Sequence, residues 1–281
     1  MSKAVFNDVS FATEAYEDRV VIYIDILGFK QWINNPKTSE EQVLSLFKEL
    51  SCWKGNGGIQ QREGDQLPKM DLSFSFFSDS LIITYPRAAS RQYFSRIHDI
   101  PEHAPIAKED YVDIITAIEA AFRVQSLIFD KFFLLSRGAI SLGKVFHKDS
   151  ENLLFGPAIN DAVWHEQNIC NTPRVILTNS IREFYSKDKL EDSGMYQDKW
   201  LVEDSDGIVY LNFLFPLLSR KISEEINLIK SNIEANIKNY ANNPKYLSKW
   251  SWLANLFNLT VTRFKELERY QSYDEIDLIK I

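Results

Sequence analysis

The stretch VVIYIDILGF, residues 20–29, decides the fold. Val20 to Ile24 are β-branched or aromatic and nearly all apolar, which predicts a strand covered on both faces. Asp25 stands near the end of this strand, and Gly28 permits a tight exit into a helix that starts with FKQWI. An acidic residue and a glycine turn at the end of a buried strand form the first candidate functional site.

The segments that follow alternate between strand and helix patterns. Thr38 and Glu41 predict a capping box for a helix at 39–50, and the polar, glycine-rich segment 54–69 predicts a loop. Residues 72–85 predict a hairpin, because Ser78-Asp79-Ser80 splits two apolar runs. The remaining patterns predict irregular or short helical structure at 87–107, a helix at 109–131, a strand at 134–147, a helix in the second half of 155–168, a strand at 174–178, and a hairpin from 200–202 and 208–213.

The C-terminal part is helical. Isoleucines recur at spacings of 4, 3, 4 and 4 between Ile222 and Ile237, which indicates one helix face. Asn243-Pro244 ends this helix, and a second runs from about residue 246 to 270. The element order predicts an α+β fold with helices on one face of a mainly antiparallel sheet. We expect a ferredoxin-like domain at 1–215 and a helical extension at 216–281, packed on it or at a dimer interface.

Composition excludes several classes of protein. The 281 residues are 45% hydrophobic and 25% charged, as in soluble globular proteins. Lys and Arg number 32 against 39 Asp and Glu, and the net charge of −7 argues against nucleic-acid binding but leaves room for a local basic pocket. Cys52 and Cys170 are too few for a disulfide framework. The absence of a signal-peptide pattern and of a long apolar run predicts a cytoplasmic protein with no membrane span.

Asp25 and Asp79 are the candidate metal ligands. Each interrupts or ends an apolar strand, where an unpaired carboxylate is costly. Two such carboxylates repel one another unless a cation lies between them, and Mg²⁺ or Mn²⁺ takes carboxylate oxygens together with substrate phosphates. The alternative is that both are turn residues, since Asp79 falls at a hairpin tip.

The turn after Asp25 adds a second feature. The N–H groups of Leu27, Gly28 and Phe29 lie where the following helix starts, and such groups can bind anionic oxygens. A metal carboxylate beside a phosphate cradle is typical of a nucleotide site.

Four segments in order resemble the class III nucleotidyl cyclases: VVIYIDILGF, FFSDSLIITY, RGAISLG and FGPAINDAV. Together they span about residues 20–180. The first resembles the family's strand with an Asp-Ile-x-Gly-Phe run, and the second its other metal-ligand hairpin. The third is similar to the family's strand with Arg, then Gly-Ile-His, then Gly. The fourth is similar to its Gly-x-x-x-Asn-x-Ala segment.

The resemblance implies two divalent metal ions, Mn²⁺ or Mg²⁺, bound by Asp25 and Asp79 with the Ile26 carbonyl completing one of them. It implies that the turn at Leu27, Gly28 and Phe29 holds the triphosphate. It also implies that Asn160 orients the ribose, with a helix N-cap as the alternative role for this residue.

This chain departs from the family pattern four residues after Asn160. The family usually carries an arginine there, and this chain has Trp164. We therefore expect another cation, Arg137 or Arg174, to replace that arginine.

The base-reading positions depart as well. Ser75 and Leu153 stand where the resemblance places the pair that reads a purine. The chain most resembles the pyrimidine cyclases of bacterial Pycsar anti-phage systems, which make a cyclic nucleotide that a separate effector protein reads. The resemblance implies conversion of UTP to cyclic UMP, with cyclic CMP from CTP as the alternative.

The resemblance also implies a homodimer with composite sites, in which Asp25 and Asp79 of one protomer face Asn160 of the other. The isoleucine stripe at 222–237 offers apolar surface for this association or for packing within the chain. Two other interpretations stay open: a catalytically silent nucleotide-binding module, and an interaction domain whose aspartates serve only in turns.

Overall fold

The computed structural model describes residues 16–51, 72–87, 109–182, 200–267, 273 and 275–280. The predicted loop at 54–69, nearly all of 87–107, and Cys52 lie outside these residues. The helices and strands follow in chain order: β1 Glu17–Leu27, α1 Phe29–Ile33, α2 Glu40–Ser51, β2 Ser73–Phe77, β3 Ser80–Pro86, α4 Glu109–Phe132, β4 Leu135–Lys148, β5 Leu153–Phe155, α5 Pro157–Ile169, β6 Val175–Leu177, α6 Asn179–Arg182, β7 Leu201–Glu203, β8 Val209–Leu211, α8 Leu214–Leu218, α9 Ser223–Asn239 and α10 Pro244–Lys265.

The strands form one mixed sheet in the order β2-β3-β1-β4-β6-β8-β7, and β5 pairs with the end of β4. All the pairings are antiparallel except that of β4 with β6. The first four strands with their helices have the split βαβ order of a ferredoxin-like fold. The predicted α+β class is therefore confirmed, including the mainly antiparallel sheet and the C-terminal helices.

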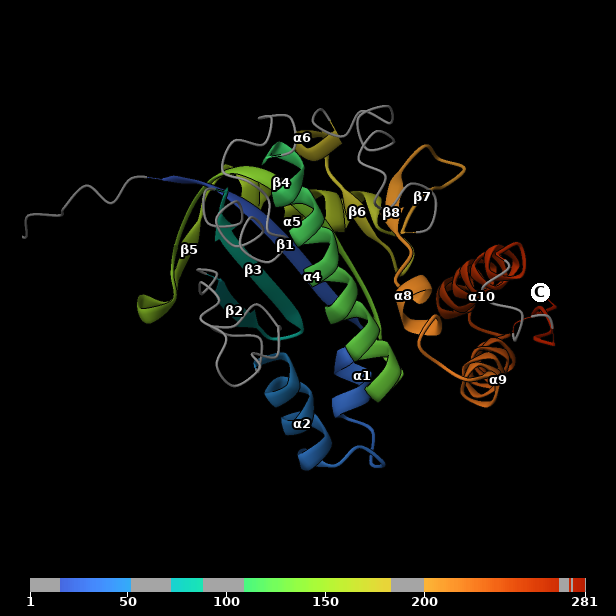
Figure 1. Ribbon diagram of the computed structural model, residues 1–281. Coiled ribbons are helices and arrows are strands. Elements are labelled where there is room, and N and C mark those ends of the chain that lie inside the picture. The colour runs from blue at the N-terminus through green and yellow to red at the C-terminus, as the bar shows by residue number, and fades with distance from the viewer. Residues whose placement is uncertain are drawn as a thin grey trace, which may run out of the picture.

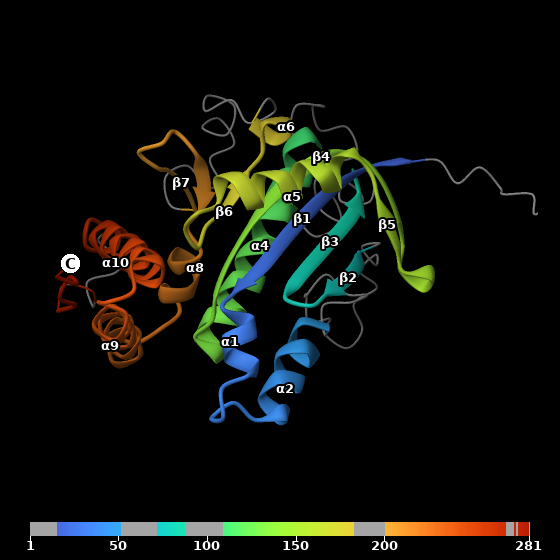
Figure 2. The same cartoon turned by 180° about the vertical axis from the view of Figure 1, so that it is seen from behind.

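Helices cover both faces of this sheet, whereas the sequence predicted helices on one face (Figures 1 and 2). Tyr85, in register with Val20, donates its hydroxyl to the Asp113 carbonyl of α4 at 2.7 Å. Ser141, in register with Val21, donates its hydroxyl to the Ala158 carbonyl of α5 at 2.6 Å. Because neighbours along a strand point to opposite faces, α4 and α5 pack on opposite sides of β1.

The two faces of β1 differ in polarity. The α4 face carries Val20, Ile22, Ile24 and Ile26, all at most 2% exposed. The α5 face carries Arg19, Tyr23 and Asp25 among its residues, so from Arg19 to Leu27 the strand presents its polar side chains on one side. The sequence prediction of a strand covered on both faces is confirmed for the residues through Ile24, and the polar face positions the candidate site.

The N-terminus of α2 differs from the predicted capping box. The Ser39 hydroxyl accepts a hydrogen bond from the Gln42 amide at 3.3 Å, and the Gln42 side chain accepts one from the Ser39 amide at 2.9 Å. The box therefore uses Ser39 and Gln42, one residue later than the predicted Thr38 and Glu41. Both pairs have the required spacing of three residues, so the pattern alone did not distinguish them.

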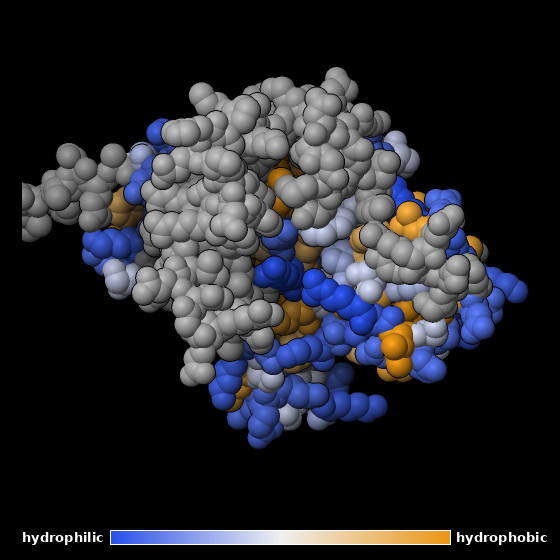
Figure 3. Space-filling view, in the orientation of Figure 1, coloured by the Kyte–Doolittle hydropathy of each residue, from blue (hydrophilic) through white to orange (hydrophobic). Residues whose placement is uncertain are grey.

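The C-terminal helices α8, α9 and α10 lie beyond the β6-β8-β7 edge of the sheet (Figures 1 and 2). Ile226, Ile229 and Ile233 of the predicted stripe are buried in the same hydrophobic cluster as the sheet, whereas Ile222 is 63% exposed. The stripe thus packs mainly within the chain. In Figure 3, hydrophobic areas on this side are small and separated by hydrophilic ones among the described residues.

Candidate active site

Asp25 and Asp79 are brought together at one end of the sheet. Asp25 lies near the end of β1, and Asp79 lies in the turn between β2 and β3. The Ile26 amide donates a hydrogen bond to the Asp79 carbonyl at 2.9 Å, which fixes the turn beside β1. The two predicted metal ligands are therefore neighbours, although they are 54 positions apart in the sequence.

The electrostatics of Asp25 reflect this arrangement. Its side chain is 17% exposed. Burial and then the negative charge of Asp79 raise the pKa of Asp25, while the Arg137 guanidinium opposes the shift. A like-charge carboxylate pair of this kind is stabilised by a cation.

Arg137 faces Asp25 from β4, in register across the sheet. Its Nε lies 3.4 Å from Asp25 Oδ2 and 2.6 Å from Glu166 Oε1, and its Nη1 donates to the Cys170 carbonyl at 2.9 Å. Of the two arginines proposed from the sequence, Arg137 is therefore the one at the carboxylates.

The close packing of β4 on β1 explains why the RGAISLG segment has a glycine, Gly138, directly after Arg137. A Cβ at this position would lie 2.0 Å from the Tyr23 carbonyl oxygen of β1. Only glycine allows β4 to approach β1 this closely, and that approach sets Arg137 opposite Asp25.

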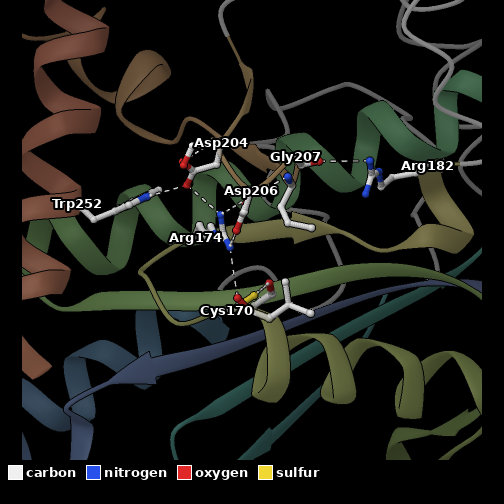
Figure 4. Close-up of polar contacts among 11 residues, drawn as sticks. Cys170, Arg174, Arg182, Asp204, Asp206, Gly207 and Trp252 are labelled. Atoms are coloured by element: carbon white, nitrogen blue, oxygen red, sulfur yellow. Dashed lines mark hydrogen bonds and ion pairs between the residues drawn. The ribbon is translucent and has the colours of Figure 1, made fainter.

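Arg174 is engaged elsewhere (Figure 4). Its guanidinium binds Asp204 at 2.9 Å and Asp206 at 2.5 Å, both in the loop of the β7–β8 hairpin. Asp204 also accepts a hydrogen bond from Trp252 Nε1 at 3.2 Å. Arg174 thus joins β6, the β7–β8 hairpin and α10. Because these acidic partners hold its guanidinium, its contacts do not support the expectation that it replaces the missing arginine.

Glu166 is a member of the site that sequence reasoning missed. It lies on α5 with its side chain 3% exposed, and its only ion-pair partner among the described residues is Arg137. Burial raises the pKa of Glu166 to about 7, although Arg137 lowers it. Its position with Ala158 and Ala162 on the buried side of α5, at spacings of four, was the signal that could have identified it.

The turn after Asp25 has the predicted geometry. Gly28 precedes α1 with φ 76°, a left-handed conformation that glycine adopts without strain. The following residue, Phe29, is buried, so the turn is held against the core. Binding of a triphosphate by Leu27, Gly28 and Phe29 stays a prediction.

Asn160 lies in the first turn of α5, and its side chain is exposed. Gly156, not Asn160, is the N-cap of this helix, so the alternative role as an N-cap is wrong. Trp164 follows one turn later on the same side and is 55% exposed. Within the described chain, no hydrogen bond or ion pair joins Asn160 to Asp25 or Asp79.

Ser75 and Leu153, the predicted base-reading residues, lie apart from one another. Ser75 is on the register row of Tyr23, two residues along β1 from Asp25, whereas Leu153 is in β5 at the end of β4. The Ser75 hydroxyl is 2.9 Å from His147 Nε2, and Leu153 pairs with Lys148 and is 41% exposed. Thr84 links His147 to the buried Arg19 through contacts of 2.8 and 2.9 Å. The edge beside Ser75 thus contains an imidazole and a guanidinium.

The described residues can supply only part of a metal site. They contain no cluster of three or more His, Cys, Asp or Glu side chains that could hold a metal ion. Two coupled carboxylates fit an ion such as Mg²⁺ that keeps water and takes other oxygens from substrate phosphates. The donor set therefore suits metal ions that arrive with a nucleotide, with Ile26 as a further predicted ligand.

Comparisons with known proteins give a distant structural likeness. No protein-family model matches the chain, and no curated protein matches it. A solved structure described as that of a bacterial light-regulated adenylyl cyclase is similar over 70% of this chain and 91% of that chain, with 13% sequence identity and a TM-score of 0.38. In the described ranges, no helix has both the length and the hydropathy needed to cross a bilayer.

Proposed function

We propose that this protein is a nucleotidyl cyclase that converts UTP to 3′,5′-cyclic UMP and pyrophosphate. The observation that carries the proposal is the pairing of Asp25 with Asp79 at the end of β1, with Arg137 in register opposite. This is an acidic pair with an adjacent cation, and it suits a substrate that brings both phosphates and divalent metal ions.

In the reaction, the ribose 3′-oxygen attacks the α-phosphorus of the same nucleotide. A new phosphorus–oxygen bond closes the ring, the 3′-hydroxyl proton passes to solvent water, and the bond from the α-phosphorus to the leaving pyrophosphate breaks. Divalent metal ions, when bound, would lower the pKa of the 3′-hydroxyl and neutralise the pyrophosphate. Little covalent chemistry is required of the protein, so positioning and charge dominate its contribution.

The residues of this chain have distinct roles in that scheme. Asp25, Asp79 and the Ile26 carbonyl would hold the metal ions, and the turn at Leu27–Phe29 would bind phosphate oxygens. Arg137 is held 3.4 Å from Asp25 Oδ2 and can bind phosphate beside the carboxylates. Asn160 orients the ribose from the partner protomer, and its exposure on α5 supports this.

The preference for a pyrimidine rests on Ser75 and Leu153, which lack the groups expected of a purine-reading pair. A site without the matching hydrogen-bonding groups loses its discrimination for a base. UTP is favoured over CTP on the resemblance to the Pycsar cyclases, in which the product activates a separate effector during phage defence. Cytidylate cyclase is the alternative.

One observation favours a second function. Trp164 is exposed one turn after Asn160, where the cyclase family carries an arginine. A catalytically silent module that binds a nucleotide and signals by association would tolerate this change.

A single pair of variants tests the proposed site. Asp25→Ala and Asp79→Ala should each reduce pyrophosphate release from UTP with Mn²⁺ below about 1% of wild type, since metal-held charge is worth several kcal/mol in such reactions. Neither should unfold the protein, because removing one of two like charges relieves repulsion without metal. Turnover near the wild-type rate in either variant would exclude this assignment, and nucleotide binding without turnover in the wild type would support the silent module.

A further inference from the structure

Two carboxylates lie beside one N–H group of Arg137. Its Nε is 2.6 Å from Glu166 Oε1 and 3.4 Å from Asp25 Oδ2. Nε carries a single proton, and that proton is donated to Asp25. Glu166 Oε1 therefore accepts no hydrogen bond, although it is the nearer oxygen and its side chain is only 3% exposed.

The unsatisfied oxygen of Glu166 is a costly feature. A buried polar atom without a hydrogen bond is unfavourable, and more so when it is charged. Among the described residues, Arg137 is the only ion-pair partner that Glu166 has. Turning the Nε–H group toward Glu166 would satisfy this oxygen, but Asp25 would then lose the hydrogen bond from its neighbouring cation.

The rest of the Arg137 guanidinium suits either arrangement. Nη1 donates to the Cys170 carbonyl at 2.9 Å, and Cys170 is the C-cap of α5, the helix that also carries Glu166. Both of these partners therefore belong to one element. Within the described chain no contact uses Nη2, so this donor can bind a phosphate in both arrangements.

A divalent metal ion at Asp25 would change the balance between the two carboxylates. Such an ion takes carboxylate oxygens as ligands, and its charge repels a guanidinium whose Nε lies 3.4 Å from Oδ2. Without another anion nearby, Arg137 would compete with the ion for Asp25. Glu166 supplies that anion, with an oxygen 2.6 Å from the same nitrogen.

We propose that Glu166 is a positioning residue that accepts the Nε–H group of Arg137 when a divalent metal ion binds Asp25, and that it thereby strengthens metal binding. In the metal-free protein Arg137 is the cation of the carboxylate pair, and in the loaded protein it is free to bind phosphate. The inference rests on the proposed function, which it deepens by assigning control of metal binding to α5.

The test titrates Mn²⁺ alone into the full chain at about pH 8, above the pKa of about 7 of Glu166, and measures free Mn²⁺ by electron paramagnetic resonance. Glu166→Leu should weaken Mn²⁺ binding about tenfold, since a hydrogen bond to a charged group contributes roughly that factor. Glu166→Gln keeps an acceptor oxygen without the charge and should weaken it about threefold. Asp206→Asn, which removes a carboxylate from Arg174, is the matched control and should change the affinity less than about twofold.

Removal of Arg137 separates positioning from simple attraction between charges. Arg137→Met alone should strengthen Mn²⁺ binding, because it removes a competing cation. In that background Glu166→Leu should change the affinity less than about twofold, since no guanidinium is left to accept and the buried Glu166 then keeps its proton. Metal-free Glu166→Leu should be at least as stable as wild type in thermal unfolding at this pH, because a carboxyl group with a raised pKa costs stability once it is ionised.

The possible outcomes distinguish this inference from the proposed function. Unchanged Mn²⁺ affinity in Glu166→Leu would overturn the role of Glu166, and so would an equal loss with and without Arg137. Mn²⁺ binding that persists at wild-type strength in Asp25→Ala would overturn the metal site on which the proposed function and this inference both rest. Mn²⁺ binding with the predicted dependence on Glu166, in a protein that cyclises no nucleotide, would overturn the proposed function alone.

Discussion

Glu166 is a carboxylate buried against Arg137, and its titration should be visible in the stability of the whole protein. Burial raises its pKa from 4.5 to about 7, so the folded protein holds this proton more tightly than the unfolded chain does. Between these pH values the free energy of unfolding should therefore fall as pH rises. Glu166→Gln should remove on the order of 2 kcal/mol of this fall, measured by denaturant unfolding from pH 4.5 to 8.

The comparison between wild type and Glu166→Gln isolates this group, since Asp25 titrates in both proteins. Parallel stability curves for the two would show that Glu166 is ionised throughout and that the Arg137 ion pair outweighs burial.

Gly138 provides a steric prediction at the same scale. Gly138→Ala would place a Cβ 2.0 Å from the Tyr23 carbonyl oxygen, so β1 and β4 would have to separate. We expect a loss of at least about 3 kcal/mol in the free energy of unfolding. Gly207→Ala is the matched control, because Gly207 has φ 76° but its added methyl group would meet no neighbour within 4 Å, and it should cost about 1 kcal/mol. Equal costs for the two would contradict the packing argument.

At the scale of elements, Trp252 links α10 to the sheet through Asp204. Trp252→Phe keeps an aromatic ring beside Tyr210 but loses the indole N–H, so the protein should lose about 1 kcal/mol of stability. The same change at Trp164, which is 55% exposed, should alter stability by less than about 0.5 kcal/mol. A Trp252→Phe variant as stable as wild type, in thermal and denaturant unfolding, would show that the hydrogen bond does not anchor α10.

The sequence was sufficient to predict most elements because their patterns are local. The apolar run at Val20–Ile24 and the Ser78–Ser80 interruption identified β1 and the β2–β3 hairpin, and the isoleucine spacing identified α9. The face covered by α5 was not predictable, since alternation along β1 shows which residues share a face but not which helix covers it.

The candidate site was predictable only in part for the same reason. Asp25 and Asp79 were identified because each breaks an apolar pattern within its own strand. Glu166 becomes a member of the site through tertiary packing of α5, and no local spacing links this residue to β1. Arg174 was proposed as a site residue, but tertiary packing pairs it with Asp204 and Asp206 instead. These partners follow about thirty positions later in the sequence, so no local pattern linked them to Arg174.

At the scale of the whole molecule, we predict a symmetric homodimer with two composite sites, in which the exposed Asn160 of one protomer faces Asp25 and Asp79 of the other. Asp25→Ala and Asn160→Ala proteins should each be inactive alone. After subunit exchange of an equal mixture, about half of the dimers would be mixed, each with one intact site, so about a quarter of wild-type activity should return. The readout is pyrophosphate release, with exchange confirmed by native mass spectrometry. Confirmed exchange without recovery of activity would contradict composite sites.

We propose that the paired carboxylates on β1 and in the β2–β3 turn support cyclisation of a nucleoside triphosphate. The most direct test incubates the purified protein with Mn²⁺ and all four nucleoside triphosphates at equal concentration, and separates the products by chromatography. We predict that cyclic UMP predominates and disappears in Asp25→Ala and Asp79→Ala proteins. Predominant cyclic CMP would correct the base, whereas predominant cyclic AMP would overturn the interpretation of Ser75 and Leu153. Release of no pyrophosphate and formation of no cyclic nucleotide from any of the four would contradict the claim itself.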